Sequence, residues 1–398
     1  MRVEMSDPEI VVSAPGKVIL FGEHAVVYGR KAIAASLDLR THLIIHLSPD
    51  STSVTLELPD IHLSKTWQVA DLAAARPTGD ADLKNPSPPS EQYLADLHRL
   101  AGTDTDHTDT RSLALLAFLY MYTSIHSTAR TCPAGRFHAS SQLPPGAGLG
   151  SSAAYCTALA AGLLTMCDVI TRHKGKNDGT GTTWSKEDLE VINAWAFQGE
   201  RLIHGNPSGI DNSVSTFGGA ISFKSGEISA FKSVAQLKIL LVNTKVPRST
   251  KVLVQGVKDR YNRLPAIIEP ILNSLEEISG TCERVLQDLG GHPVEIQENT
   301  QEKNYHVLEE LVDICQSLLN AIGVGHPSLD QVSSVTAKHG LHSKLTGAGG
   351  GGCALVLLRP DTAPDAVDKV KTELRDCGFD VWETSIGATG VSQHSQLK

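Results

Sequence analysis

Hydrophobic positions divide the chain into a strand-rich first half and a helix-rich second half. In the first half, short apolar runs with many β-branched residues alternate with turn residues, a pattern typical of strands. The Pro15-Gly16 pair and Gly22 interrupt these runs. The strands expected from this pattern are Glu9–Ala14, Lys17–Phe21, Ala32–Leu37, His42–His46 and Ser53–Leu58.

The middle of the chain predicts three helices. Ser112–Ser127 is apolar on nearly every position and indicates a mostly buried helix. Ser151–Asp168 is rich in alanine, with larger apolar residues on compatible turns. Ser185 is a good N-cap with Asp188 three residues later, so a third helix is expected to run through Glu200 and end near Gly205-Asn206-Pro207.

The remaining pattern predicts a mixed second half. Apolar runs predict strands at Leu237–Asn243, Cys353–Leu358 and Asp380–Ile386. Helical periodicity covers Thr250–Leu286, Thr300–Ile322 and Ala363–Cys377. Polar stretches rich in Pro, Gly, Asp and Ser predict loops at Arg76–Ser90, Gly102–Thr110 and His173–Thr183, the last of them mobile.

These elements predict an α+β protein of two domains. The length of 398 residues fits two cores. We place the boundary within Phe223–Gln236, which gives an N-terminal domain over residues 1–228 and a C-terminal domain over residues 229–398. No repeat period is visible.

Composition predicts a cytosolic protein without a membrane segment. The longest apolar stretch, Ala153–Met166, is shorter than the roughly 20 residues that span a bilayer. Met1–Ile10 carries acidic residues before any apolar run, unlike a signal peptide. The seven cysteines form no CxxC pair, which favours free thiols in a reducing compartment. Association with an organelle such as the peroxisome stays open.

The net charge limits the class of partner. A formal charge of −9 argues against a nucleic-acid partner, which requires a basic face. The field of the whole molecule would also repel an anionic substrate. Any phosphate or carboxylate must therefore be held by a local cluster of amides and cations.

The strongest chemical signal is the segment Leu143-Pro-Pro-Gly-Ala-Gly-Leu-Gly-Ser-Ser-Ala-Ala-Tyr155. Alternate glycines allow the backbone to approach a ligand closely, and the following helix directs its free amides and positive dipole end at the same point. The segment lacks the lysine of a Walker A loop, and Ser151 stands where the dinucleotide-binding pattern needs its last glycine. We expect a site for a di- or triphosphate; the alternative is a plain strand-to-helix turn.

A second glycine run, Gly347-Ala-Gly-Gly-Gly-Gly352, satisfies the spacing of a dinucleotide-binding loop. An apolar strand follows it where that fold requires a helix, so dinucleotide binding is not expected. The run could wrap around a phosphate or close over another loop, and a flexible hairpin is an equal alternative.

Three charged residues stand beside glycine-rich turns. Glu200 lies near a helix end and Asp211 follows a tight turn, which supplies one carboxylate for Mg²⁺ and one for a substrate hydroxyl. Lys17 lies in an apolar strand, where burial would require a charge partner. Taken singly, each has a plainer explanation: a solvated helix face, an Asx-turn, and a lysine that reaches solvent.

Together and in this order, these segments closely resemble the GHMP kinases, named for galactokinase, homoserine kinase, mevalonate kinase and phosphomevalonate kinase. The matching motifs are Pro15-Gly-Lys17, Pro144-x-x-x-Gly-Leu-Gly-Ser-Ser152 and Lys344-Leu-Thr-Gly-Ala-Gly-Gly350. The resemblance covers about residues 8–393. Ala14–Tyr28, Trp195-Ala-Phe-Gln-Gly-Glu200 and His204-Gly-Asn-Pro-Ser-Gly-Ile-Asp211 resemble the branch that phosphorylates mevalonate.

The resemblance implies a fold and a set of site residues. The implied fold is an N-terminal domain like ribosomal protein S5 and a C-terminal ferredoxin-like domain, with the site between them. The implied catalytic residues are Asp211, as the base, and Lys17. The implied ATP-binding residues are Lys17, Asp60, Ser141, Gly146, Ala147, Gly148, Leu149, Gly150, Ser151 and Ser152. The implied Mg²⁺ ligands are Ser152 and Glu200, and the implied substrate-binding residues are Glu23, His24, Thr250 and Ala348.

The resemblance also implies a reaction: ATP-dependent phosphorylation of the C5 hydroxyl of mevalonate to 5-phosphomevalonate, a step of isoprenoid and sterol biosynthesis, with ATP and Mg²⁺ as cofactors. Asp211 would accept the hydroxyl proton while Lys17 stabilises charge on the attacking oxygen. A homodimer is expected from the resemblance alone. The alternatives are another small-molecule kinase of the family, or a silent relative that binds nucleotide as a sensor; retention of Lys17 and Asp211 argues against the latter.

Overall fold

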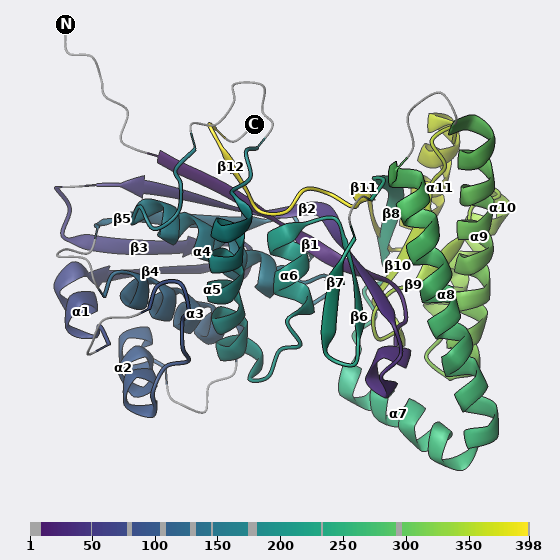
Figure 1. The fold of residues 1–398 in the computed structure, drawn as a ribbon, viewed down its shortest axis with the longest axis horizontal. Coiled ribbons are helices and arrows are strands. Elements are labelled where there is room, and N and C mark those ends of the chain that lie inside the picture. Colours follow the sequence, from purple (N-terminus) through teal and green to yellow (C-terminus); the bar gives the residue numbers. More distant parts are fainter. Residues whose placement is uncertain are drawn as a thin grey trace, which may run out of the picture.

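The structure is a computed structural model that describes residues 9–48, 50–77, 82–103, 109–127, 133–144, 146–173, 181–231, 234–291 and 297–396. In this part of the chain, strands from both halves join one sheet in the order β4-β3-β5-β2-β11-β8-β10-β9. β1 pairs with β2 and β12, while β6 pairs with β2 and β7. Figure 1 shows β1 and β2 running from the N-terminal half toward the C-terminal half.

The N-terminal half is a sheet with helices packed on one side (Figure 1). Its strands are β1 (Glu9–Phe21), β2 (Ala32–Leu47), β3 (Ser53–Leu58), β4 (Leu63–Gln68), β5 (Gly135–Ser141), β6 (Ala220–Lys224) and β7 (Glu227–Ala230). Its helices are η1 (Ala25–Tyr28), η2 (Pro59–Ile61), α1 (Val69–Ala74), α2 (Glu91–Ala101), α3 (Thr110–Ile125), α4 (Ser151–Met166), α5 (Lys186–His204) and α6 (Ile210–Phe217).

The core of this half explains why α3 and α4 are apolar around their whole circumference. α4 lies between β1, β2, α3 and α5, so almost every side chain is buried whichever way it points. Phe118 of α3 packs against Trp67, Tyr122 and Phe137, with ring centroids 5.2–5.7 Å apart. This packing fixes the start of α4, and that is the end that carries the glycine-rich loop.

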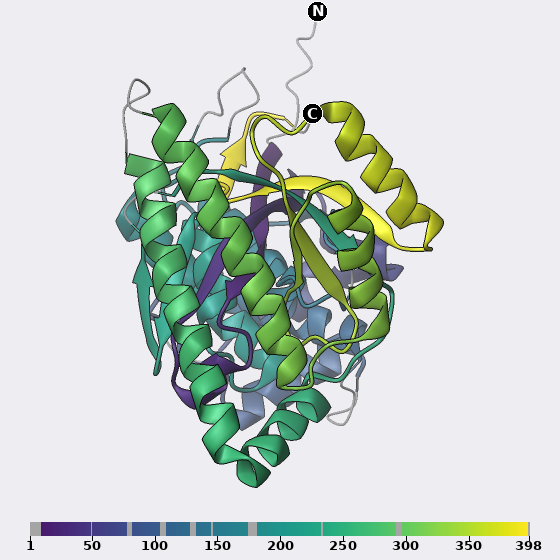
Figure 2. The same cartoon turned by 90° about the vertical axis from the view of Figure 1, so that its right-hand side faces the viewer.

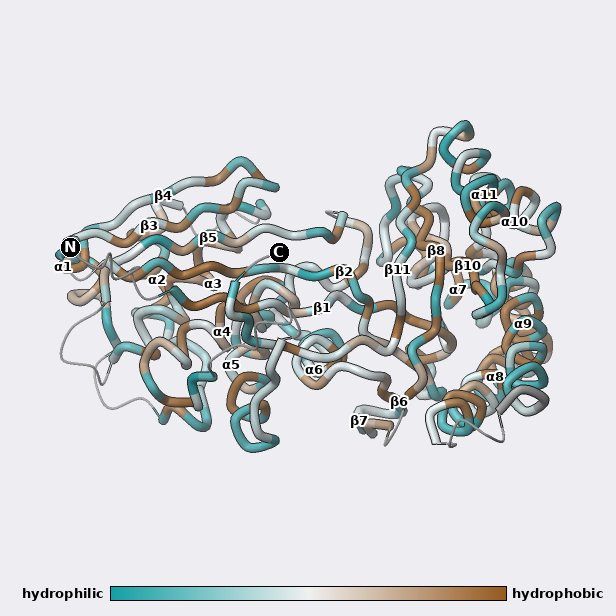
Figure 3. The backbone as a smooth tube through the Cα atoms, turned by 90° about the horizontal axis from the view of Figure 1, so that it is seen from above, coloured by the Kyte–Doolittle hydropathy of each residue, from teal (hydrophilic) through white to brown (hydrophobic). Residues whose placement is uncertain are grey.

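The C-terminal half holds the smaller part of this sheet and is rich in long helices. Its helices are α7 (Thr250–Arg263), α8 (Pro265–Gly291), α9 (Gln297–Ala321), α10 (Pro327–Lys338) and α11 (Pro364–Asp376). Its strands are β8 (Leu237–Asn243), β9 (Ser343–Leu345), β10 (Cys353–Leu357), β11 (Asp380–Ile386) and β12 (Ser392–His394). Figure 2 looks onto this half, where α8 and α9 pack side by side. In Figure 3 the hydrophobic residues gather on strands such as β8 and β10.

Ion pairs join the two halves along α8. Lys31 Nζ lies 2.6 Å from a carboxylate oxygen of Glu283. Lys224 Nζ lies 2.8 Å from Glu276 Oε1, and Arg30 Nε lies 3.7 Å from Glu276 Oε2. At the other end, β12 pairs with β1, so the last described strand returns to the sheet of the N-terminal half. The division into residues 1–228 and 229–398 stays a prediction.

Most of the predicted helices and strands are present, although some predicted strands merge into one and one predicted helix is divided in two. The strands predicted at Ser53–Leu58, Leu237–Asn243 and Asp380–Ile386 have the predicted bounds, and Ser185 caps α5 by accepting a hydrogen bond from the backbone N–H of Asp188. Pro15-Gly16 does not end a strand: β1 continues through it with a shift of register against β2. β2 likewise joins two predicted strands, whereas the predicted helix over Thr250–Leu286 is divided at Leu264.

Several elements were missed because their signals are local and weak. α1, α2, α6, β4 to β7 and α10 are short or amphipathic and lack a long apolar run. Residues 78–81, 104–108 and 174–180 of the three predicted loops lie outside the described residues. None of the helices in the described part of the chain combines the length and the apolar character that a bilayer-spanning helix requires.

Candidate active site

The glycine-rich loop before α4 has the backbone that the sequence predicted. Gly146, Gly148 and Gly150 all have positive φ, between 69° and 75°, which L side chains rarely adopt. Gly150 is the N-cap of α4, and no side chain among the described residues caps this end, which leaves the first amides of the helix for a ligand. A buried 16-residue helix therefore directs the positive end of its dipole at a bare backbone loop, which suits a phosphate group.

Lys17 and Asp211 meet at the end of this loop. The Lys17 backbone N–H donates to the carbonyl oxygen of Leu149 at 2.8 Å, so β1 holds the loop in place. Lys17 Nζ lies 3.3 Å from Asp211 Oδ1, and a Cβ on Gly150 would come within 2.9 Å of the Lys17 chain. Asp211 lies in the first turn of α6, rather than in the free turn that its sequence suggested.

Glu200 and Ser152 form a polar corner beneath the loop. Glu200, on α5, is buried, and burial raises the pKa of its carboxyl to about 7; the nearby Asp211 adds to the rise and Ser152 opposes it. Glu200 Oε1 is buried without a hydrogen-bond partner among the described residues. Ser152 Oγ lies 3.1 Å from Nε2 of His204, whose ring also lies 3.8 Å from Glu200 Oε2. An orphaned buried carboxylate oxygen beside a hydroxyl fits a hard cation.

A cavity of about 530 Å³ opens beside these residues. It is lined in part by ten of the predicted residues: Lys17, Asp60, Ser141, Gly146, Gly148, Leu149, Gly150, Ser151, Ser152 and Asp211. At its far side Asp60 Oδ2 accepts a hydrogen bond of 2.7 Å from the backbone N–H of Ser141. Apolar side chains such as Leu58 and Leu113 line the same side, as expected for a site that takes a base or sugar. Ala147 belongs to the loop but is not among the lining residues.

A second cluster lies where β1 meets the second glycine run. Glu23 and Lys344 form an ion pair in which both side chains are fully buried. Burial raises the pKa of the Glu23 carboxyl, and Lys344 opposes this rise. His24 Nε2 donates to the carbonyl oxygen of Ala348 at 2.8 Å, and burial lowers the pKa of the ring. Glu23, His24 and Ala348 are thus brought together as predicted neighbours.

Thr250 has no such contact with the other predicted substrate-binding residues in the described part of the chain. It is exposed at the first turn of α7, and no side-chain hydrogen bond joins it to the other site residues in the described part of the chain. Neither Lys344 nor Arg248 was predicted from the sequence to have a role in the site. Lys344 is the first residue of the motif Lys344-Leu-Thr-Gly-Ala-Gly-Gly350, so its place before a glycine run could have indicated a role in the site. Arg248 follows strand β8 in a loop that carries no recognisable motif.

The arrangement is suited to moving a phosphoryl group. Such a reaction requires positioning of two oxygens and neutralisation of charge, with little covalent help from the protein. The backbone of the glycine-rich loop, the Ser152 hydroxyl and the Lys17–Asp211 pair line one cavity. The second glycine run is tied to β1, with the Thr346 hydroxyl donating to the carbonyl oxygen of Ile19 at 2.8 Å.

Comparison with known proteins gives a consistent result. The family described as GHMP kinases N terminal domain matches residues 113–219, and the family described as GHMP kinases C terminal matches residues 296–376. The chain is 51% identical to the mevalonate kinase of Mus musculus over 393 residues, which covers 98% of this chain and 96% of that protein. It is also 51% identical to the mevalonate kinase of Homo sapiens over 387 residues, with coverage of 97% and 95%.

Solved structures support the same fold. The crystal structure of the Methanococcus jannaschii mevalonate kinase has a TM-score of 0.65 at 20% identity and covers 96% of this chain and 99% of that one. The structure of L. major mevalonate kinase in complex with R-mevalonate has a TM-score of 0.64 at 20% identity, with coverage of 95% and 96%. At these identities the likeness concerns the fold alone.

Proposed function

The chain belongs to the GHMP kinase family, and we infer that it transfers the γ-phosphoryl group of ATP to the C5 hydroxyl of mevalonate, giving 5-phosphomevalonate and ADP. The observation that carries the chemical step is the Lys17–Asp211 pair, 3.3 Å apart at the end of a phosphate-binding loop. The choice of mevalonate rests on 51% identity over nearly the full chain to kinases of that name. The product is an intermediate of isoprenoid and sterol biosynthesis.

Asp211 and Lys17 divide the work of the transfer. Asp211 accepts the proton of the C5 hydroxyl as its oxygen forms a bond to the γ-phosphorus, and the bond from that phosphorus to the β–γ bridging oxygen breaks. The bridging oxygen keeps the electron pair and leaves as part of ADP. Lys17 Nζ lies beside the attacking oxygen and stabilises its negative charge.

Mg²⁺ is the cation that the Ser152–Glu200 corner fits. This ion keeps several waters and phosphate oxygens, so two protein oxygens are enough to place it. When bound, it neutralises charge on the β- and γ-phosphates. The buried Glu200 Oε1 without a partner and the Ser152 hydroxyl are the oxygens available for it among the described residues.

The loop amides from Gly146 to Ser152 would hold the phosphates, and Asp60 with Ser141 would border the nucleoside. Mevalonate would lie on the side of Glu23, His24, Thr250 and Ala348, where the second glycine run meets β1. A homodimer and a cytosolic location remain expectations from the resemblance and from the cysteine pattern.

The direct test is a coupled ADP-release assay on the purified chain with mevalonate, phosphomevalonate, homoserine and galactose, followed by mass spectrometry of the product. Only mevalonate should support turnover, with a mass increase of one phosphoryl group. Faster turnover on any other acceptor would contradict the assignment, and ATP hydrolysis without an acceptor product would contradict the kinase reaction itself.

A further inference from the structure

Arg248 lies between the two glycine-rich loops. It follows β8 and precedes α7, and its guanidinium donates from Nη2 to the carbonyl oxygen of Ala147 at 2.7 Å. A Cβ on Gly148 would come within 2.8 Å of the same nitrogen, and a Cβ on Gly347 within 3.8 Å. A Cβ on Gly352 would coincide with the guanidinium. The side chain of a C-terminal residue thus reaches the phosphate-binding loop of the N-terminal half.

The charge of Arg248 is not matched by an acid. Of the cations at this cleft, Lys17 pairs with Asp211 and Lys344 pairs with Glu23. In the described residues, no carboxylate oxygen lies within 4.0 Å of the Arg248 nitrogens, and the Ala147 carbonyl is the one hydrogen-bond acceptor recorded for its side chain. A guanidinium carries five N–H donors in a planar fork that matches phosphate oxygens. Most of its donors, and all of its charge, therefore remain available to an anion.

The position of Arg248 indicates which group of the bound ATP and acceptor its guanidinium can contact. The loop at Ala147 and Gly148 belongs to the nucleotide side, whereas Gly347 precedes Ala348 and Thr250 follows two residues after Arg248, both on the acceptor side. The group that passes from one side to the other is the γ-phosphoryl group. A cation that contacts both loops is placed for that group rather than for the nucleoside or the far end of the acceptor.

We propose that Arg248 is a further catalytic residue, whose guanidinium leaves the Ala147 carbonyl when ATP binds and contacts the oxygens of the γ-phosphoryl group during transfer. It acts on the side opposite Lys17, so that the transferred group lies between two cations. This role rests on the proposed kinase reaction. Glycine at position 352 is then required because any side chain there would occupy the space of the guanidinium.

The test compares nucleotides that differ only in the third phosphate. Binding of Mg·AMPPNP and of Mg·ADP is measured by calorimetry, without mevalonate, for the wild-type chain and for Arg248→Met. The AMPPNP affinity should fall about tenfold to a hundredfold, since a hydrogen-bonded charge is lost, while the ADP affinity changes less than about twofold. In the full reaction kcat should fall about 10²–10³-fold, as for the loss of one preorganised donor to a developing charge.

Two results would overturn the proposal. Equal weakening of AMPPNP and ADP would make Arg248 a structural latch for the loop. Unchanged binding of both nucleotides with a raised KM for mevalonate would assign it to the carboxylate of the acceptor. Because the binding assay contains no acceptor, a wrong substrate assignment would leave its outcome unaffected.

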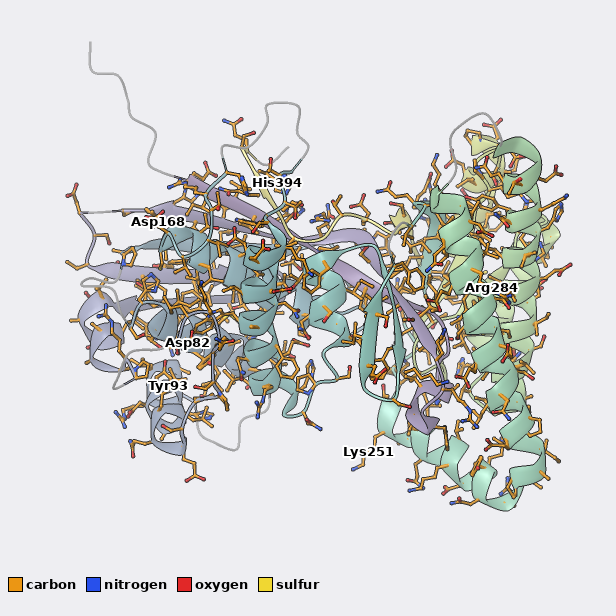
Figure 4. All side chains as sticks on the ribbon, viewed as in Figure 1. Asp82, Tyr93, Asp168, Lys251, Arg284 and His394 are labelled. Atoms are coloured by element: carbon orange, nitrogen blue, oxygen red, sulfur yellow. The ribbon has the colours of Figure 1, made fainter. Side chains whose placement is uncertain are left out.

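The matched control is Lys251→Met, which removes one positive charge three residues away. The Lys251 side chain points into solvent from the first turn of α7 (Figure 4) and should leave both affinities and kcat unchanged. If Arg248→Met does not fold, as judged by its thermal melt, Arg248→Lys keeps the charge without the fork. That variant should bind AMPPNP less tightly than the wild type and ADP equally well; equal loss for both nucleotides would again contradict the proposal.

Discussion

Two lysine–carboxylate pairs lie near the two glycine-rich loops, and they differ in their access to solvent. Lys17 and Asp211 lie 3.3 Å apart with side chains 12% and 34% exposed, beside the bare amides of the phosphate-binding loop. Lys344 and Glu23 have no exposed side-chain surface, and Lys344 Nζ also donates to the Leu345 carbonyl oxygen at 2.7 Å. The open pair is accessible to a substrate, whereas the closed pair ties Glu23, which follows β1, to Lys344 of β9.

The difference shows that burial decides whether a lysine–carboxylate pair is available for chemistry or acts mainly in the structure. A partly exposed pair contributes little to stability, because solvent screens it, and keeps its charges available for chemistry. A buried pair contributes little net stability as a pair, yet removing one partner leaves an uncompensated buried charge. We therefore expect variants of the open pair to lose activity and variants of the closed pair to lose stability.

Substitutions in the open pair, Lys17 and Asp211, are expected to have the largest effect, a loss of kcat. Asp211→Ala should lower kcat by about 10²–10⁴-fold, since the base is lost, while the free energy of unfolding changes by less than about 0.5 kcal/mol. Stopped assays of phosphorylated product and urea unfolding measure the two quantities. Lys17→Met is the companion variant, expected to lower kcat in the same way. Near-normal turnover of Asp211→Ala would refute the assignment of the base.

The closed pair should show the opposite result. Lys344→Met leaves Glu23 without its partner and should lower the free energy of unfolding by about 3–5 kcal/mol. Urea unfolding of the purified variant gives this value. Adding Glu23→Gln to Lys344→Met removes the orphaned charge and should restore part of the stability. A single variant as stable as the wild type would show that this pair does not act as a structural tie.

The pH dependence of stability should report the buried acid Glu200. Its pKa of about 7 in the folded chain exceeds the ordinary value of 4.5, so between these pH values the folded chain binds a proton that the unfolded chain has released. Stability of the metal-free chain should therefore fall as pH rises from 4.5 to 7, by up to about 3 kcal/mol for this group. Glu200→Gln should lack this component when unfolding is compared at the two pH values. Identical pH profiles would contradict the shift.

The smallest effect is expected at Ser152. Ser152→Ala removes one neutral oxygen from the proposed Mg²⁺ corner and should raise the Mg²⁺ concentration for half-maximal activity by about fivefold to tenfold. Titration of Mg²⁺ at saturating ATP measures this shift, with Ser151→Ala as the neighbouring comparison. An unchanged titration curve for Ser152→Ala would count against ligation.

Alternate glycines before an apolar helix predicted a phosphate-binding loop, with a plain strand-to-helix turn as the alternative, and Gly146, Gly148 and Gly150 have the positive φ that such glycines allow. It also predicted the strands whose apolar runs are bounded on both sides, such as Leu237–Asn243. It could not predict the continuity of β1 through Pro15-Gly16, since the shift of register that absorbs this turn depends on pairing with β2.

The site residues that the sequence did not predict depend on contacts between segments far apart in the chain. Nothing near Lys344 or Glu23 in the sequence indicates that they meet, because they are 321 residues apart. Arg248 has no motif of its own, and its position beside Ala147 and Gly352 follows only from the packing of the two halves. The site residues with a local signature were therefore available from the sequence, whereas those whose role depends on the cleft were not.

The most direct measurement is a crystal structure of this chain with Mg·AMPPNP and mevalonate bound. We predict that the C5 oxygen of mevalonate lies within about 2.6–3.2 Å of an Asp211 carboxylate oxygen, with Lys17 beside it and the terminal phosphate in line. A C5 oxygen out of hydrogen-bond reach of Asp211, with the phosphates away from the Gly146–Ser152 loop, would contradict it.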